Sequence, residues 1–163
     1  MSVIEFSPNH VFTMRRYALI RDGAEIGQID CGGAGGTATI SIGGTTSKPV
    51  TDSLIRGKFH LEKDGTLLAA AQSAGFWRRR FNIQAGAKSC TLMALWSGRR
   101  FALMQNDTEV GRIGATTFFG GKGNAELPDD LPLEVQAFLI WLVIATWRRT
   151  VVTATMAGTA AGR

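Results

Sequence analysis

The segment from Asp129 to Thr150, DDLPLEVQAFLIWLVIATWRRT, constrains the fold of this chain more than any other. Pro132 follows two aspartates, which suits the first turn of a helix, where acidic side chains oppose the positive end of the helix dipole. Every residue from Ala137 to Ala145 is apolar, so the helix has no polar face to offer to water. Such a helix must be buried, either in protein or in lipid.

The length of the apolar run favours protein over lipid. A membrane-spanning helix needs about 20 apolar residues, whereas a run of about 10 to 14 is more often a core helix. The run from Val135 to Trp147, with Gln136 and Thr146 inside it, falls in the shorter class. We therefore predict a core helix over 131–149. The alternative is a membrane-anchored protein in which Leu131 to Trp147 spans the lipid.

A repeat with a period of 42 residues is the second constraint. Segments that begin at Arg16, Lys58 and Arg100 align as RYALIRDGAEIG, KFHLEKDGTLLA and RFALMQNDTEVG. Each segment has the pattern of a β-hairpin, with a turn at Asp-Gly or Asn-Asp between two apolar runs. Alternation along the first strand places an aromatic residue and a leucine on one face. We predict that these residues are core: Tyr17, Leu19, Phe59, Leu61, Phe101 and Leu103.

Two other positions recur in the repeat. The basic residue that starts each hairpin points away from the predicted core, so we interpret it as an edge or surface charge. A small residue ends each hairpin, and there a larger side chain would collide with something packed against the sheet. The predicted helix is a candidate for that neighbour. The small residues are Gly27, Ala69 and Gly111.

Further strands are expected between the hairpins, over 37–42, 76–84 and 90–96. Three units of about four strands each suggest a closed barrel, and a barrel of about twelve strands has an interior too wide for its own side chains to fill. An apolar helix is a suitable plug. The predicted fold is therefore mainly β, a closed barrel of about twelve strands in three 42-residue repeats, threaded by a buried C-terminal hydrophobic helix. Residues 1–150 form the barrel with its central helix 131–149, and 151–163 form a flexible tail.

Repeated hairpins followed by an apolar helix, here LPLEVQAFLIWLVIATWRR, resemble the tubby C-terminal-like superfamily, which includes the tubby domain, phospholipid scramblases and LURP-one-related proteins. The small LURP-one-related and scramblase-like bacterial members are the most similar, over roughly Phe12 to Arg149, including the piece FHLEKDGTLLAAA. The resemblance implies a twelve-stranded barrel around the terminal helix, and binding of phosphoinositide-like headgroups through basic residues. The chain departs from scramblases in having no cysteine cluster and no proline-rich leader.

Catalytic chemistry has little support in the sequence. His10 and His60 are its histidines, and the acidic residues cluster only at the helix start, where Glu126, Asp129 and Asp130 are explained by helix capping as well as by a calcium loop. We therefore expect no enzyme activity, no catalytic residue, no cofactor and no metal. Cys31 and Cys90 are interpreted as free thiols, although pairing is an open alternative.

Binding is better supported, because the net charge is +5 and no acidic residue lies between Asp64 and Asp107. The segment 75–81 mixes aromatic residues with arginines, which suits contact with phosphates. In the alternative interpretation Trp77 and Phe81 are core and the arginines protect a sheet edge. The candidate lipid-binding residues are Arg78, Arg79, Arg80, Arg99 and Arg100.

The expected partner is an anionic membrane surface, or else a protein for which this chain is an interaction scaffold. A nucleic acid partner is not favoured, and no small-molecule substrate is inferred. The first ten residues, MSVIEFSPNH, show no signal peptide. We therefore expect a cytoplasmic protein that attaches peripherally to the membrane if it binds lipid.

Overall fold

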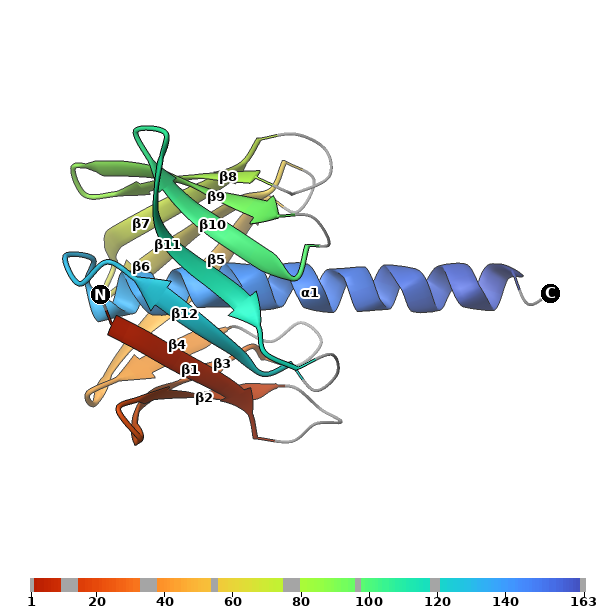
Figure 1. Ribbon diagram of the computed structural model, residues 1–163, viewed down its shortest axis with the longest axis horizontal. Helices are drawn as coiled ribbons and strands as arrows, with labels where there is room; N and C mark the ends of the chain where they lie inside the picture. The colour runs from red at the N-terminus through yellow and green to blue at the C-terminus, as the bar shows by residue number, and fades with distance from the viewer. Residues whose placement is uncertain are drawn as a thin grey trace.

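The computed structural model is a closed antiparallel β-barrel with one long helix running through it (Figure 1). It describes residues 2–9, 15–32, 38–53, 56–74, 80–95, 98–117 and 121–161, and for Ser2 and residues 149–161 it describes the backbone alone. The helix α1 spans Leu133–Ala161. The strands that precede it are β1 Ser2–Pro8, β2 Arg16–Arg21, β3 Ala24–Asp30, β4 Thr39–Ile42, β5 Thr45–Ser53, β6 Lys58–Lys63, β7 Thr66–Ser73, β8 Arg80–Ala85, β9 Lys88–Leu95, β10 Arg100–Gln105, β11 Thr108–Ala115 and β12 Gly123–Leu127.

Each strand pairs with its neighbours in the sequence, and β1 pairs with β12 to close the barrel. The connections therefore alternate between two ends. We call one the turn end: it holds the tight turns after β2, β4, β6, β8 and β10, and the segment 128–132 that leads into α1. We call the other the loop end: it holds the remaining connections, and α1 leaves the barrel there (Figure 1). The predicted mainly β fold, a closed twelve-stranded barrel with a C-terminal helix, is confirmed.

The three predicted hairpins are β2–β3, β6–β7 and β10–β11, and they share two local features. Their turns place Asp22, Asp64, and Asn106 with Asp107 at positive φ, which aspartate and asparagine tolerate better than most residues. Each pair also shifts register after the leucine of the predicted core, at Leu19, Leu61 and Leu103. All six predicted core residues are buried. That the three units are full copies of one another stays a prediction.

At two of the three hairpins, the small residue that ends the hairpin has the next strand, and not the helix, as its closest neighbour. A Cβ added at Gly111 would lie 2.6 Å from the carbonyl oxygen of Glu126 on β12, and at Gly27 it would collide with the backbone of Ser41 on β4. The helix was one candidate for the neighbour that excludes larger side chains, and at Gly27 and Gly111 the nearest atoms belong to a strand instead. At these two glycines the backbone of the next strand of the barrel, β4 or β12, leaves no room for a larger side chain.

The helix fills the barrel with side chains on all its sides. Residues 137–144 are each at most 6% exposed, and they belong to the same buried cluster as the inward side chains of the strands. Aromatic rings contribute directly: the Phe138 and Trp141 rings stack with centroids 5.9 Å apart, and Trp141 meets Phe59 of β6 edge to face at 5.8 Å. The segment that the membrane-anchored alternative would place in lipid is thus packed inside the barrel. Within the part of the chain that the structure describes, no helix combines the length and apolar character needed to cross a membrane.

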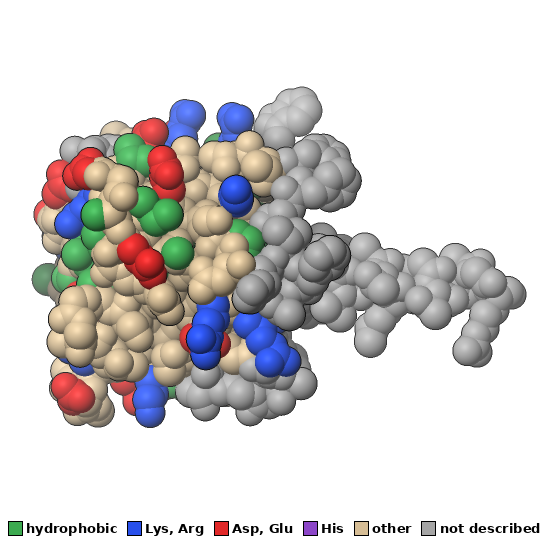
Figure 2. Space-filling view, turned by 90° about the horizontal axis from the view of Figure 1, so that it is seen from below, with side chains coloured by type: hydrophobic (Ala, Val, Ile, Leu, Met, Phe, Trp, Pro, Cys, Tyr) green, Lys and Arg blue, Asp and Glu red, His purple; other side chains and the backbone are tan. Residues whose placement is uncertain are grey.

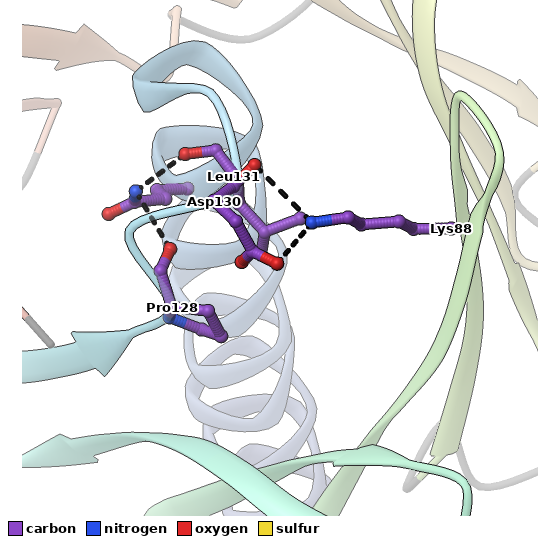
Figure 3. A network of polar contacts seen from close by, with 5 residues as sticks. Lys88, Pro128, Asp130 and Leu131 are labelled. Atoms are coloured by element: carbon purple, nitrogen blue, oxygen red, sulfur yellow. Dashed lines mark hydrogen bonds and ion pairs between the residues drawn. The ribbon is translucent and has the colours of Figure 1, made fainter.

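The start of α1 is fixed at the turn end (Figure 3). Lys88 of β9 forms an ion pair with Asp130, and Lys63 of β6 bonds Glu134 at 3.2 Å. Gln136, a polar residue in the apolar run, donates from Nε2 to the carbonyl oxygens of Leu131 at 2.8 Å and Pro128 at 3.2 Å. The buried amide therefore satisfies carbonyls of the chain that turns into the helix.

The helix bounds differ from those predicted. The helix begins at Leu133, after Pro132, whose carbonyl accepts the hydrogen bond from Gln136 N at 3.0 Å. Its backbone continues to Ala161, past the predicted end at residue 149. The predicted tail from residue 151 is thus helical in its backbone, and its flexibility stays a prediction.

Replacing Ile140 with aspartate tests whether α1 is the core of the barrel. Ile140 is fully buried, and an unpaired carboxylate there costs several kcal/mol, a large part of the roughly 5–15 kcal/mol that stabilises a domain. We expect Ile140→Asp to lose its cooperative thermal transition in circular dichroism. Leu67→Asp, which adds the same charge at a residue 63% exposed, should melt like the parent protein. A soluble Ile140→Asp variant with a cooperative transition would contradict a core role for the helix.

Gly111→Ala tests the close approach of β12 to the hairpin β10–β11. The added methyl group meets backbone, which cannot move aside without disturbing strand pairing, so we expect a loss of about 1–3 kcal/mol in unfolding free energy. The matched control is Gly114→Ala on the same strand, where the new Cβ meets the flexible side chain of Arg100 at 3.2 Å. Equal stability of the two variants in urea titrations would show that the contact with β12 is not limiting.

Candidate functional site

The charged residues are divided between the two ends of the barrel. Every acidic residue except Glu5, Asp30 and Asp52 lies at the turn end, either in a turn, at the helix start or within two residues of the end of a strand. In the view of Figure 2 the carboxylates lie mostly away from the end where the helix leaves. The loop end is basic. Its described cationic residues are Arg15, Arg16, Arg56, Lys58, Arg80, Arg99, Arg100, Lys122 and Arg148.

Three of the five predicted arginines are described, and all three lie at this basic end. Arg80 begins β8 and Arg100 begins β10; the residues opposite them on β9 are Met93 and Leu95, so both arginines project from the outer face of the sheet. Arg80 Nη2 lies 3.1 Å from Met93 Sδ, and Arg99 Nη2 donates to the Thr117 carbonyl oxygen at 2.9 Å. Arg78 and Arg79 lie outside the described residues.

The other cations of the loop end were not predicted from the sequence, although a signal for some of them was present. The hairpins begin with Arg16, Lys58 and Arg100, and each hairpin starts at the same end because the barrel is an up-and-down meander. These residues were interpreted separately as edge or surface charges. Closure of the barrel collects them into one surface, together with cations of the intervening loops.

The two carboxylates at the loop end are both engaged. Asp30 pairs with Arg16 at 3.3 Å and accepts a hydrogen bond from the backbone N–H of Gly32 at 2.9 Å. Asp52 contacts His60 at 2.6 Å. The basic end therefore keeps a strong excess of positive charge among the described residues.

A collar of contacts surrounds α1 where it leaves the barrel. Trp147 Nε1 donates to the Gly98 carbonyl oxygen at 2.9 Å, and the Trp147 ring lies 5.9 Å from the ring of Phe6. Burial raises the pKa of the Cys31 thiol, while the nearby Arg148 guanidinium opposes that rise. Cys31 and Cys90 are both free, so the open question of their pairing is settled against a disulfide.

A hollow of about 500 Å³ lies on the barrel wall formed by β5 to β9. Its lining offers amides, hydroxyls and one charge of each sign, from residues that include Asp52, Lys58, Gln72, Asn82, Gln84 and Thr91. These groups can form hydrogen bonds with a polar ligand. Among the described residues, no cluster of three histidine, cysteine or acidic side chains could hold a metal ion, and this includes the helix start considered as a calcium loop.

Comparison with known proteins finds no matching protein-family model, no similar curated protein and no similar solved structure. The resemblance to the tubby C-terminal-like superfamily therefore stays a prediction.

Tyr17, the single tyrosine of the chain, lies close to Cys31 and Arg148, and its pKa can be measured. Burial, more than the nearby Cys31, raises the pKa of Tyr17 to about 12. Because the charged form is disfavoured in the folded state, the unfolded chain releases its proton first, and stability falls as the pH rises above about 10. We expect the phenolate absorbance to appear with a midpoint at about 12 in the native protein, and at about 10 in denaturant. A midpoint near 10 while circular dichroism still shows folded protein would contradict a buried Tyr17.

Proposed function

We propose that this protein is a non-enzymatic binding module that associates with anionic membrane surfaces through the basic loop end of its barrel. The chemistry is attraction between arginine or lysine side chains and lipid phosphates, with phosphoinositide-like headgroups as the ligands that the tubby-like resemblance implies. Attachment is peripheral, and the apolar part of α1 inside the barrel is not the anchor.

The division of charge between the ends carries this proposal. Acidic residues at the turn end have local structural reasons: aspartates occupy turn positions with positive φ, and others precede or begin the helix. Turn geometry does not favour arginine or lysine in the same way at the loop end. The excess of cations there lies on one side of the molecule, as expected of a surface that meets an extended polyanion.

The form of the basic end supports lipid rather than nucleic acid. The cations come from strands around the whole barrel mouth, not from two walls of a channel, so they suit a flat anionic surface. The backbone of α1 continues out of this end, and the sequence from Thr150 to Ala161 has no charged residue (Figure 1). A fluid lipid surface can accommodate such a projection, whereas a rigid duplex would be held away from the cations.

The proposal is tested by comparing two double variants, one that removes two positive charges from the loop end and one that removes two from elsewhere. Each Lys or Arg near an anionic leaflet contributes about 1 kcal/mol, so Arg80→Gln with Arg100→Gln should weaken binding to phosphatidylserine vesicles by about 30-fold. The matched control, Arg21→Gln with Lys48→Gln, removes the same net charge from outside the loop end. It should keep most of the affinity. Binding is measured by vesicle flotation at low and high salt, and salt should release the parent protein.

Equal loss of affinity in both double variants would mean that net charge, and not the loop end, governs binding. Absence of binding to any vesicle would reject the lipid proposal. The protein would then be an interaction scaffold, and the next step would be to look for a protein partner. Thermal melting of both double variants controls for the fold, because the four residues are outside the buried core.

A further inference from the structure

A β-bulge in β5 places the carboxylate of Asp52 next to the imidazole of His60 on β6. The register passes from Thr51 opposite Phe59 to Ser53 opposite Lys58, so Asp52 is the extra residue without a partner. A bulge redirects the side chain it carries. Asp52 Oδ2 consequently lies 2.6 Å from Nδ1 of His60, on the outer face of the barrel.

The other ring nitrogen of His60 also faces a carboxylate. Nε2 lies 3.2 Å from Oε1 of Glu62, two residues further along β6. A neutral imidazole carries one N–H and can donate to one carboxylate only, whereas the imidazolium donates to both. Both contacts are hydrogen bonds to ionised carboxylates only when both ring nitrogens are protonated, so this arrangement suits the histidine cation.

The charged groups around this trio come from two strands. On β5, Lys48 is directly opposite Glu62, and on β6, Lys58 precedes His60 by two residues. The adjacent strand β7 contributes Ala70 opposite His60 and Gln72 opposite Lys58, neither of which is charged. The hydrogen bond with Asp52 is the main cause that raises the pKa of His60, partial burial opposes it, and Glu62 adds to the rise. The proton is therefore lost above the ordinary value of about 6.5.

We propose that Asp52, His60 and Glu62 form a proton-operated switch in which Glu62 leaves His60 for Lys48 when the imidazole becomes neutral. The remaining N–H stays on Nδ1, where the contact with Asp52 is the shorter of the two. Glu62 then faces the lone pair of Nε2 and is repelled. Lys48 is the cation directly across the strand pair, and the side chain of Glu62 is 37% exposed, so it has room to turn.

The exchange makes the trio more negative by one charge, because the imidazolium loses its proton. Asp52 and Lys58 both line the hollow on the barrel wall. The switch thus alters the electrostatic character of the hollow independently of whether the loop end binds lipid.

Nuclear magnetic resonance follows both partners in one experiment. In a His10→Gln background, His60 is the single histidine, and its ring carbon and the carboxyl carbon of Glu62 are titrated together. We expect one shared midpoint above about 6.5. Glu62→Gln should lower the midpoint of His60, and Asp52→Asn should lower it further because that contact is the stronger. Lys48→Gln should reduce the response of the Glu62 carbon in the His60 step.

A carboxyl carbon of Glu62 that responds only in the acidic range, and not with His60, would overturn the exchange of partners. A midpoint of His60 that Glu62→Gln leaves unchanged would remove the contact on which the proposal rests. Unchanged amide spectra away from β5 and β6 show that each variant folds.

The pH dependence of protein stability gives an independent check of the raised pKa of His60, because the direction of the change is known in advance. The pKa of His60 is raised in the folded state, so its contribution is complete below the unfolded value of about 6.5 and is lost as the pH rises through the folded value. His60→Gln should remove this decline from the pH profile of the melting temperature. A decline that persists in His60→Gln would assign it to another group and overturn the switch.

Discussion

The apolar surface on all sides of α1 is the constraint on which the rest of this structure depends. A helix without a polar face needs apolar neighbours in every direction, and a single sheet or helix covers only one side. Twelve strands around the helix cover all sides, and the helix in turn fills an interior that is too wide for strand side chains alone. The apolar side chains of the helix and the inward side chains of the strands are therefore buried only against each other. The contacts of Trp141 with Phe59 on one side and Phe138 on its own helix illustrate this dependence.

Features set by local pattern were predictable from the sequence. Alternation identified Tyr17 and Leu19 as core, and the uninterrupted apolar run identified the plug. Features set by register were not predictable. The small residue Gly111 marked a close approach in the sequence, but that β12 is the neighbour depends on strand pairing, which the local sequence does not show. The helix backbone continues to Ala161, past the predicted end at residue 149, although the threonines and valines after Arg149 have low helix propensity.

The candidate site likewise has one part that was predictable from the sequence and one part that was not. A run of basic residues around Arg80 was visible in the sequence, because its members are adjacent. The wider basic surface was not visible, since its members come from strand ends and loops scattered along the chain, and only the meander of the barrel brings them to one end. Asp52 and His60 likewise join through a bulge between two strands. Acidic turns and basic loops therefore alternate in the sequence, while in space they separate into two opposite surfaces.

Placing the core helix after all twelve strands has a consequence for how the chain folds. The closing pair joins β1 to β12, which are separated by most of the sequence, so this contact carries a large entropic cost and forms slowly. During synthesis the inward faces of the strands have nothing to pack against until α1 follows them. Their apolar rows then stay exposed to other chains for most of translation, which favours aggregation over productive folding. The order of elements in this fold thus delays full burial of the inner strand faces until α1 has been made.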